Sequence, residues 1–170
     1  RGELVPGDVE VSDGVVVDVG LSGGTPGRVA VPGFVDLQVN GFGGVDFLSA
    51  SSEDYVRAGE ALLQAGVTAY QPTFITASEQ TLLDAIRAVP TESDGPRIIG
   101  AHVEGPFLAP ERLGTHPHEH RRDPDIDLLE RLLGAGHVTE MTLAPELPGA
   151  AAVIRRLLER VDRSVVDQYQ

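Results

Sequence analysis

The stretch Ala101-His102-Val103-Glu104-Gly105-Pro106-Phe107 decides how the fold is interpreted. It reads as the end of a strand that begins at about residue 97 and stops at a sharp Gly-Pro turn. Side chains alternate along a strand, so His102 and Glu104 share one face. Functional side chains of parallel α/β folds lie at the carboxyl ends of strands, which makes Glu104 a candidate ligating or catalytic carboxylate. A plain salt-bridge role for Glu104 is the alternative.

Strand, loop and helix alternate four times from residue 31 onward. The apolar runs predict strands over residues 34–39, 67–71 (stopped by Pro72), 97–103 and 138–143. Caps and turn residues predict helices over residues 52–65, 78–89 and 125–133, and a fourth helix opened by Pro148 that carries Val153, Ile154, Leu157 and Leu158 on one face. Repeated strand–helix units predict a parallel sheet with right-handed crossovers.

A closed (β/α)8 barrel of the TIM type needs eight such units and roughly 250 residues. About four βα units therefore predict an α/β fold that is the first half of such a barrel, over residues 32–160. An open, doubly wound sheet fits the periodicity alone equally well. Residues 1–31 predict a small β segment, the remnant of a β-sandwich, in which Ser12-Asp13-Gly14 turns between strands 9–11 and 15–19. Residues 161–170 form an atypical tail.

The first strand also ends in polar residues. Alternation places Asp36, Gln38 and Asn40 on one face, where they would point into a barrel mouth. Inward polar side chains are costly unless they bind a ligand or form a hydrogen-bonded network, and both interpretations stay open. The following Gly41-Phe42-Gly43-Gly44 is not a dinucleotide fingerprint, because no helix begins directly after it.

The loop over residues 105–124 is long enough to be functional. It holds Gly114-Thr115-His116 and then His118 and His120. A three-histidine metal cluster is disfavoured by the hydrophilic, interrupted sequence, and His116 is the better functional candidate. Glu146, after the fourth strand, is interpreted as a charge at the start of the next helix.

The composition limits the partners. Among 170 residues, 13 are Lys or Arg and 26 are Asp or Glu, which gives a formal charge of -13. This balance disfavours binding to nucleic acid and to anionic membranes. Without cysteine, a metal would need His, Asp or Glu ligands. No membrane span or leader is expected, and the cytoplasm is the default location.

Seven stretches carry a resemblance in this order: residues 31–36 (Val-Pro-Gly-Phe-Val-Asp), 40–41, 43–47, 66–68 with 72–73, 102–107, 114–116 and 142–146. Together they resemble the N-acetylglucosamine-6-phosphate deacetylases of the amidohydrolase superfamily, from about residue 5 to about residue 160. The resemblance implies hydrolysis of the N-acetyl group of N-acetylglucosamine 6-phosphate, in a cytoplasmic homodimer that holds one divalent ion per chain, zinc being expected.

The same resemblance implies roles for single residues. Glu104 would ligate the metal, and His116, with Thr115 beside it, would contact the acetamido group of the substrate. Gln38 and Asn40 stand where many amidohydrolases carry His-x-His, which implies a single-metal site. These two residues, with His102, are the remaining candidates for the barrel mouth.

The family's two further metal-ligating histidines and its general-base aspartate are expected beyond Gln170. The hypothesis is therefore a truncated or frameshifted chain that has no catalytic base and is inactive. Another amidohydrolase acting on a cyclic or acyl amide, and a non-catalytic remnant, are the alternatives.

Overall fold

The computed structural model describes residues 5–21 and 29–160. The chain divides into two units, the first ending at Pro32 and the second beginning at Gly33. The first unit holds an antiparallel hairpin of β1 (Asp8–Ser12) and β2 (Val15–Leu21). Its turn has positive φ at both Asp13 (49°) and Gly14 (75°), as the Asp-Gly pair predicts. The assignment of this unit to a β-sandwich stays a prediction. The atypical tail predicted over residues 161–170 lies outside the described residues.

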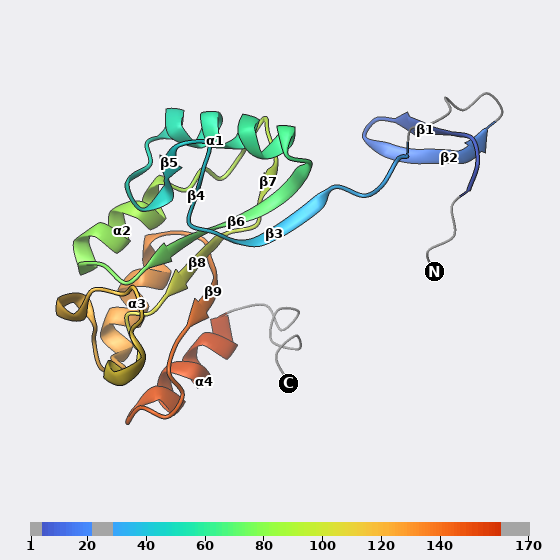
Figure 1. Ribbon diagram of the computed structural model, residues 1–170. Helices are drawn as coiled ribbons and strands as arrows, with labels where there is room; N and C mark the ends of the chain where they lie inside the picture. The colour runs from blue at the N-terminus through green and yellow to red at the C-terminus, as the bar shows by residue number, and fades with distance from the viewer. Residues whose placement is uncertain (1–4, 22–28, 161–170) are drawn as a thin grey trace. The chain divides into compact units, whose positions relative to one another are not determined.

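The second unit is built on a parallel sheet in the order β3-β6-β8-β9 (Figure 1). These strands are Phe34–Val39, Val67–Ile75, Ala101–Glu104 and Val138–Thr142, and short β7 (Arg97–Ile98) also pairs with β6. The spatial order follows the chain order, which confirms the predicted parallel pairing. A doubly wound sheet instead reverses its order at a switch point, and this path contains no such reversal.

The first three helices begin at the predicted caps. They are α1 (Ser52–Gln64), α2 (Glu79–Ala88), α3 (Ile126–Ala135) and α4 (Ala150–Arg160), with a short 3-10 turn η1 at Phe47–Ser49. Ser51 forms a capping box with Asp54, and the side chains of Ser78 and Asp125 accept hydrogen bonds from the first turns of α2 and α3. Gly66, just past α1, has a φ of 84°.

Four details differ from the sequence prediction. Strand β6 does not stop at Pro72 but continues to Ile75. Pro72 lies opposite Val39 of β3, and on the other side of β6 it falls between the residues paired with β7 (Ala69 and Tyr70) and those paired with β8 (from Thr73 onward). The predicted third strand is broken between β7 and β8, where Gly100 has a φ of 145°.

The other two differences concern the loops and α4. A two-residue hairpin, β4 (Gly41–Phe42) with β5 (Val45–Asp46), was not predicted. Helix α4 begins at Ala150, two residues after Pro148, and buries Val153, whereas Leu158 is 40% exposed and does not belong to the buried face.

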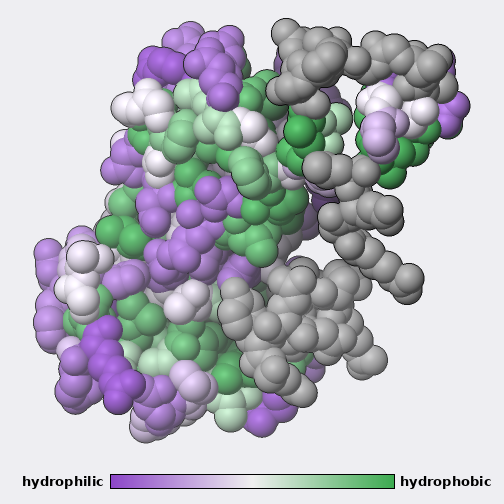
Figure 2. Space-filling view, turned by 45° about the vertical axis from the view of Figure 1, so that its right-hand side comes forward, coloured by the Kyte–Doolittle hydropathy of each residue, from purple (hydrophilic) through white to green (hydrophobic). Residues whose placement is uncertain are grey.

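The core lies between the sheet and the helices. Phe47 stacks on both Tyr55 and Tyr70, with ring centroids 5.1 and 5.6 Å apart. Leu82 and Ile86 of α2 and Leu129 and Leu132 of α3 are buried in the same cluster. Other apolar side chains stay at the surface, Val35 and Leu37 of β3 among them. Figure 2 shows hydrophobic and hydrophilic residues intermixed on one face of the molecule. The core thus packs the helices against the sheet, and the carboxyl ends of the strands continue into loops.

Candidate functional site

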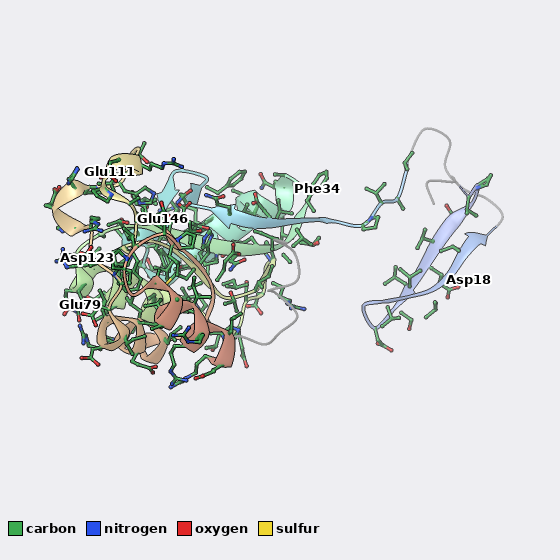
Figure 3. The ribbon with its side chains drawn as sticks, turned by 90° about the horizontal axis from the view of Figure 1, so that it is seen from below. Asp18, Phe34, Glu79, Glu111, Asp123 and Glu146 are labelled. Atoms are coloured by element: carbon green, nitrogen blue, oxygen red, sulfur yellow. The ribbon has the colours of Figure 1, made fainter. Side chains whose placement is uncertain are left out.

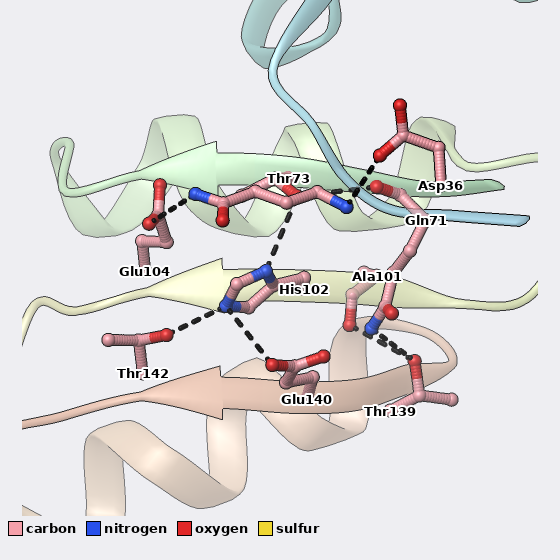
Figure 4. A network of polar contacts seen from close by, with 10 residues as sticks. Asp36, Gln71, Thr73, Ala101, His102, Glu104, Thr139, Glu140 and Thr142 are labelled. Carbon is pink, nitrogen blue, oxygen red and sulfur yellow. Dashed lines mark hydrogen bonds and ion pairs between the residues drawn. The ribbon is translucent and has the colours of Figure 1, made fainter.

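The candidate site lies where β3, β6, β8 and β9 end. Glu111 and Glu146, in the loops after β8 and β9, lie at the opposite end of the unit from Phe34, with which β3 begins (Figure 3). Polar side chains of the strands gather on one face, and Figure 4 shows them in front of the strands with helices behind. The site is therefore on the sheet face turned away from these helices.

Glu104 and Gln38 meet across the sheet. The Gln38 side-chain amide on β3 donates to a carboxylate oxygen of Glu104 on β8, with Nε2 and Oε1 2.8 Å apart. The strands are far apart in sequence but are separated in the sheet only by β6. The structure thus brings together two candidates from different strands, and Glu104 is paired with an amide, with no arginine bonded to it in the described residues.

His102 bridges the strands on both sides of β8 (Figure 4). Its Nδ1 lies 3.3 Å from the Thr73 hydroxyl on β6, and its Nε2 lies 2.8 Å from the Thr142 hydroxyl on β9. The Glu140 carboxylate is 3.9 Å from the same Nε2. Burial lowers the pKa of His102, and the nearby negative charges of Glu140 and Glu104 oppose that shift. Both ring nitrogens are thus engaged by protein, which suits a structural bridge.

Asn40 belongs to the same network. Its side-chain amide donates to the main-chain oxygen of Thr73 at 3.3 Å. Asp36 accepts from the main-chain nitrogen of Gln38 at 3.1 Å, so its carboxylate is used within β3. The inward polar residues of the first strand therefore form a hydrogen-bonded network, and only Gln38 among them contacts Glu104 directly.

His116 reaches the site through Thr76, the residue directly after β6. The main-chain N–H of Thr76 donates to Nδ1 of His116 at 3.2 Å, and the Thr76 hydroxyl donates to the main-chain oxygen of Glu104 at 3.1 Å. The loop histidine is thus tied to the strand end that carries Glu104. Thr115 is exposed, and its side chain has no hydrogen bond to the described residues.

The remaining loop candidates lie apart from this network. His118 and His120 belong to a 3-10 turn, and their rings make no hydrogen bond within residues 5–21 and 29–160. Glu146 is exposed in the turn before α4, and the first turn of α4 contains no acidic residue. The interpretation of Glu146 as a helix-start charge was therefore wrong, because the helix starts later than Pro148 suggested.

A cavity of about 590 Å³ adjoins the network. It lies between the β4–β5 hairpin and the end of β6 and is lined by Asn40, Gly41, Phe42, Gly43, Gly44, Val45, Asp46, Leu48, Thr73 and Ile75. Asn40 and Thr73 thus connect the cavity to the strand-end network. The glycine run lets the main chain form one wall of this cavity.

The described residues do not by themselves form a metal centre. No group of three or more His, Asp or Glu side chains among them could hold an ion. Catalytic zinc usually takes three protein ligands. Glu104, whose carboxylate accepts a hydrogen bond from Gln38, is the candidate ligand at the strand ends. A complete centre would need further ligands from outside these residues.

Sequence reasoning missed Thr73, Thr76, Glu140 and Thr142. Alternation from Glu104 would not have found them, because they lie on other strands whose register is set by pairing. Ending the second strand at Pro72 also hid Thr76, which follows β6 as Gly105 follows β8. The one available signal was the polar content of Gln-Pro-Thr and of Thr-Glu-Met-Thr inside predicted strands.

Comparison with known proteins gives a consistent result. No family model matches the chain. It is 40% identical over 146 residues to N-acetylglucosamine-6-phosphate deacetylase from Homo sapiens, a match that covers 79% of this chain and 35% of the human protein.

Solved structures agree with the sequence match. The crystal structure of N-acetyl-D-glucosamine-6-phosphate deacetylase from Mycobacterium smegmatis superposes with a TM-score of 0.75 at 34% identity, over 89% of this chain and 42% of that one. The enzyme from Thermotoga maritima gives a TM-score of 0.77 at 27% identity, over 90% and 42%. A variant of the Mycobacterium smegmatis enzyme is solved in complex with N-acetyl-D-glucosamine-6-phosphate.

No helix in the described part of the chain has the length and apolar character needed to cross a bilayer. The matches in sequence and in structure are to the same group of enzymes, and the parallel sheet agrees with them. The chain is a homologue of the N-acetylglucosamine-6-phosphate deacetylases and spans about a third of the length of the curated relatives it matches.

Proposed function

We propose that this chain contributes part of a metal-dependent deacetylase site, namely the strand ends of the first half of a barrel. The complete site would hydrolyse the N-acetyl group of N-acetylglucosamine 6-phosphate. The observation that carries the proposal is the hydrogen bond of Gln38, on β3, to the Glu104 carboxylate at the end of β8, with only β6 between the two strands. Glu104 is proposed as a ligand of one divalent ion, with zinc expected. His116, with Thr115 beside it, is proposed to contact the acetamido group. The proposed setting is a cytoplasmic homodimer, as expected of the family.

The parallel sheet supports the proposal that residues 32–160 form half of a (β/α)8 barrel. Its strands follow one another in chain order, and right-handed crossovers then place successive helices on the same face. Helix α2 contacts α3, and α3 contacts α4, so these three helices form one continuous layer. Such a layer outside a sheet with a polar inner strand end is the arrangement of a barrel wall.

The proposed roles of the chain's own residues concern binding and orientation. The Gln38 amide holds one oxygen of the Glu104 carboxylate, which leaves the other oxygen to a ligand. A hydrogen bond of this kind restricts the carboxylate to one rotamer and so prepares it for an incoming cation. No described residue is proposed as the general base, which is expected beyond Gln170.

The competing amidohydrolase assignment is weaker for a specific reason. Those relatives are expected to carry two histidines where this chain has Gln38 and Asn40. In the structure the side-chain amide of Gln38 donates to Glu104, and that of Asn40 donates to the Thr73 carbonyl. A histidine nitrogen that binds a metal has no hydrogen to donate, so these two residues act as hydrogen-bond donors where a second metal would need ligands. The two residues thus support a site with a single ion.

The test is acetate release from N-acetylglucosamine 6-phosphate. We expect no release from these 170 residues alone, because Glu104 is the one ligand, and no residue is the base, that we propose among the described residues. A chimera in which they replace the matching part of the Mycobacterium smegmatis enzyme should be active, and Glu104→Gln in that chimera should abolish acetate release. Glu146→Gln, at an exposed residue outside the network, is the matched control and should leave the rate unchanged.

Acetate release by the 170 residues alone, or an active Glu104→Gln chimera, would contradict the proposal. Zinc titration by calorimetry separates the non-catalytic alternative. The chimera should bind one ion per chain and lose it with Glu104→Gln, whereas a remnant that merely keeps the fold should show no dependence on Glu104.

A further inference from the structure

Thr76 is a buried residue that touches two proposed functional groups at once. It is 1% exposed and follows β6 directly. Its hydroxyl oxygen lies 3.0 Å from Nδ1 of His116 and 3.1 Å from the main-chain oxygen of Glu104. Nothing in the sequence singled it out, and the mechanism proposed above does not use it.

The main-chain N–H of Thr76 decides where the neutral His116 ring carries its proton. This N–H points at Nδ1 with a nitrogen–nitrogen distance of 3.2 Å, and its hydrogen cannot be moved or removed. A second hydrogen on Nδ1 would face it, so Nδ1 must act as the acceptor. The neutral ring then carries its proton on Nε2, since one nitrogen of neutral imidazole donates while the other accepts.

The Thr76 hydroxyl is compatible with that arrangement. It lies about equally far from Nδ1 of His116 (3.0 Å) and from the carbonyl oxygen of Glu104 (3.1 Å), so its single proton is shared between these two acceptors in a three-centre hydrogen bond, which requires no proton on Nδ1. Nε2 of His116 has no hydrogen-bond partner among the described residues, which leaves its N–H free to donate to a ligand.

Close packing reinforces the link. Gly105 follows Glu104, and a Cβ at that position would lie 2.3 Å from the Thr76 hydroxyl oxygen. The hydroxyl therefore sits against bare main chain, where it can reach the Glu104 carbonyl. The turn after Glu104 and the residue after β6 constrain each other.

We propose that Thr76 is a positioning residue that fixes the Nε2–H tautomer of His116 through its main-chain N–H and holds the His116 loop to the Glu104 strand end through its hydroxyl. The inference rests on the proposed function in one respect, which is that the Nε2–H donor is the group offered to the carbonyl of an acetamide. The tautomer itself follows from the geometry alone.

The test is NMR of the chain labelled with nitrogen-15 at histidine and with carbon-13 at main-chain carbonyls, recorded with magic-angle spinning so that self-association does not prevent the measurement. The pH is set about two units above the ordinary imidazole pKa of about 6.5. His116→Gln identifies the His116 signals. His118 and His120, whose rings make no hydrogen bond within the described residues, serve as internal references.

We expect the wild-type His116 signals to show a protonated Nε2 and a bare Nδ1, without the averaging of the references. Thr76→Val keeps the main-chain N–H and should keep this tautomer, while the carbonyl signal of Glu104 shifts because its hydroxyl donor is lost. Thr76→Ser should restore that carbonyl signal.

A proton on Nδ1, an averaged tautomer in the wild-type chain, or an unshifted Glu104 carbonyl in Thr76→Val would overturn the inference. Loss of the tautomer in Thr76→Val would assign the effect to the hydroxyl and also overturn it as stated. The deacetylase proposal fails on a different measurement, acetate release by the chimera, so the two failures are distinguishable.

Discussion

Gly105 is the residue at which sequence and structure are most tightly joined. Its φ of 83° lies in the left-handed region, and an added Cβ would come within 2.3 Å of Thr76 and 3.2 Å of the Leu108 side chain. A substitution there meets both main-chain strain and a collision, because the neighbouring hydroxyl belongs to a buried side chain.

We expect Gly105→Ala to lower the free energy of unfolding by about 1–3 kcal/mol, the usual cost of such strain, measured by urea denaturation. Gly114→Ala is the matched control, since Gly114 also has a positive φ of 59° but has nothing within 4 Å of an added Cβ. An equal loss in both variants would mean that the contact with Thr76 adds nothing.

His102 offers a second residue-scale prediction. His102→Leu removes the ring partner of the buried Thr73 hydroxyl, which keeps its donation to the Gln71 carbonyl, and the ring partner of the exposed Thr142 hydroxyl. The loss of a buried hydrogen bond costs about 0.5–1.5 kcal/mol, so the denaturation midpoint should fall accordingly. His118→Leu changes an exposed ring and should stay within about 0.5 kcal/mol of wild type. A stable His102→Leu chain would show that the bridge is dispensable.

At this scale the sequence predicted residues that share a strand and missed those that do not. Alternation was enough to place His102 and Glu104 on one face, because the period of a strand is fixed. The partners of these residues depend on how strands are aligned, and register shifts such as the one between Ala101 and His102 are invisible to alternation. Thr76 was therefore not found from the sequence, and Thr142, although it begins one of the resembling stretches, was not singled out as a partner of His102.

Among the elements, the helices are joined by ion pairs at their surfaces. Arg131 of α3 pairs with Glu79 of α2, and Arg156 and Arg160 of α4 pair with Glu130 of α3. The hydrogen bond from Arg156 is the main cause that lowers the pKa of Glu130, and the positive charges of Arg156 and Arg160 act in the same direction. These links join neighbouring helices of one layer.

A carboxylate with a lowered pKa contributes stability that is present above the ordinary value, about 4.3, and is lost as the pH falls through the folded-state value. We therefore expect Glu130→Gln to lower the urea midpoint near neutral pH and the difference from wild type to vanish in acid. Glu60→Gln, at an exposed residue of α1 without an ion pair in the described structure, should give no such pH-dependent difference. A difference for Glu130→Gln that persists in acid would contradict the assignment.

Element boundaries show where sequence prediction stops. Caps such as Ser78 and Asp125 act through local hydrogen bonds, so the starts of α2 and α3 were predictable. Pro72 misled because its effect depends on whether a neighbouring strand needs its N–H, which only the pairing of β6 with β3, β7 and β8 decides. Helix α4 was placed two residues early for the same kind of reason, since Pro148 favours a turn as well as a first helical residue.

For the molecule as a whole, the parallel sheet has two outer strands, β3 and β9, in the part of the chain that the structure describes. Val35 and Leu37 of β3 are 60% and 41% exposed. An outer strand with unpaired main-chain groups and apolar side chains is a template for pairing with another chain. We therefore expect these 170 residues, when alone, to self-associate.

Val35→Lys with Leu37→Lys should shift the sedimentation profile of the chain toward monomer, because charged side chains discourage pairing at an outer strand. Val56→Lys is the matched control, since Val56 is 65% exposed but lies on helix α1. The expectation fails if the double variant and the control sediment alike, or if the unsubstituted chain is already monomeric.

The hydrogen bonds of His102 to Thr73 and Thr142 have a consequence for how such a protein can change over generations. Side chains as well as main-chain hydrogen bonds hold these three neighbouring strands together. The loops that follow the strands therefore do not have to hold them in place. Exchanges at exposed positions of the following loop, such as Glu111 and Glu119, can then occur without disturbing the frame that holds Glu104 in place.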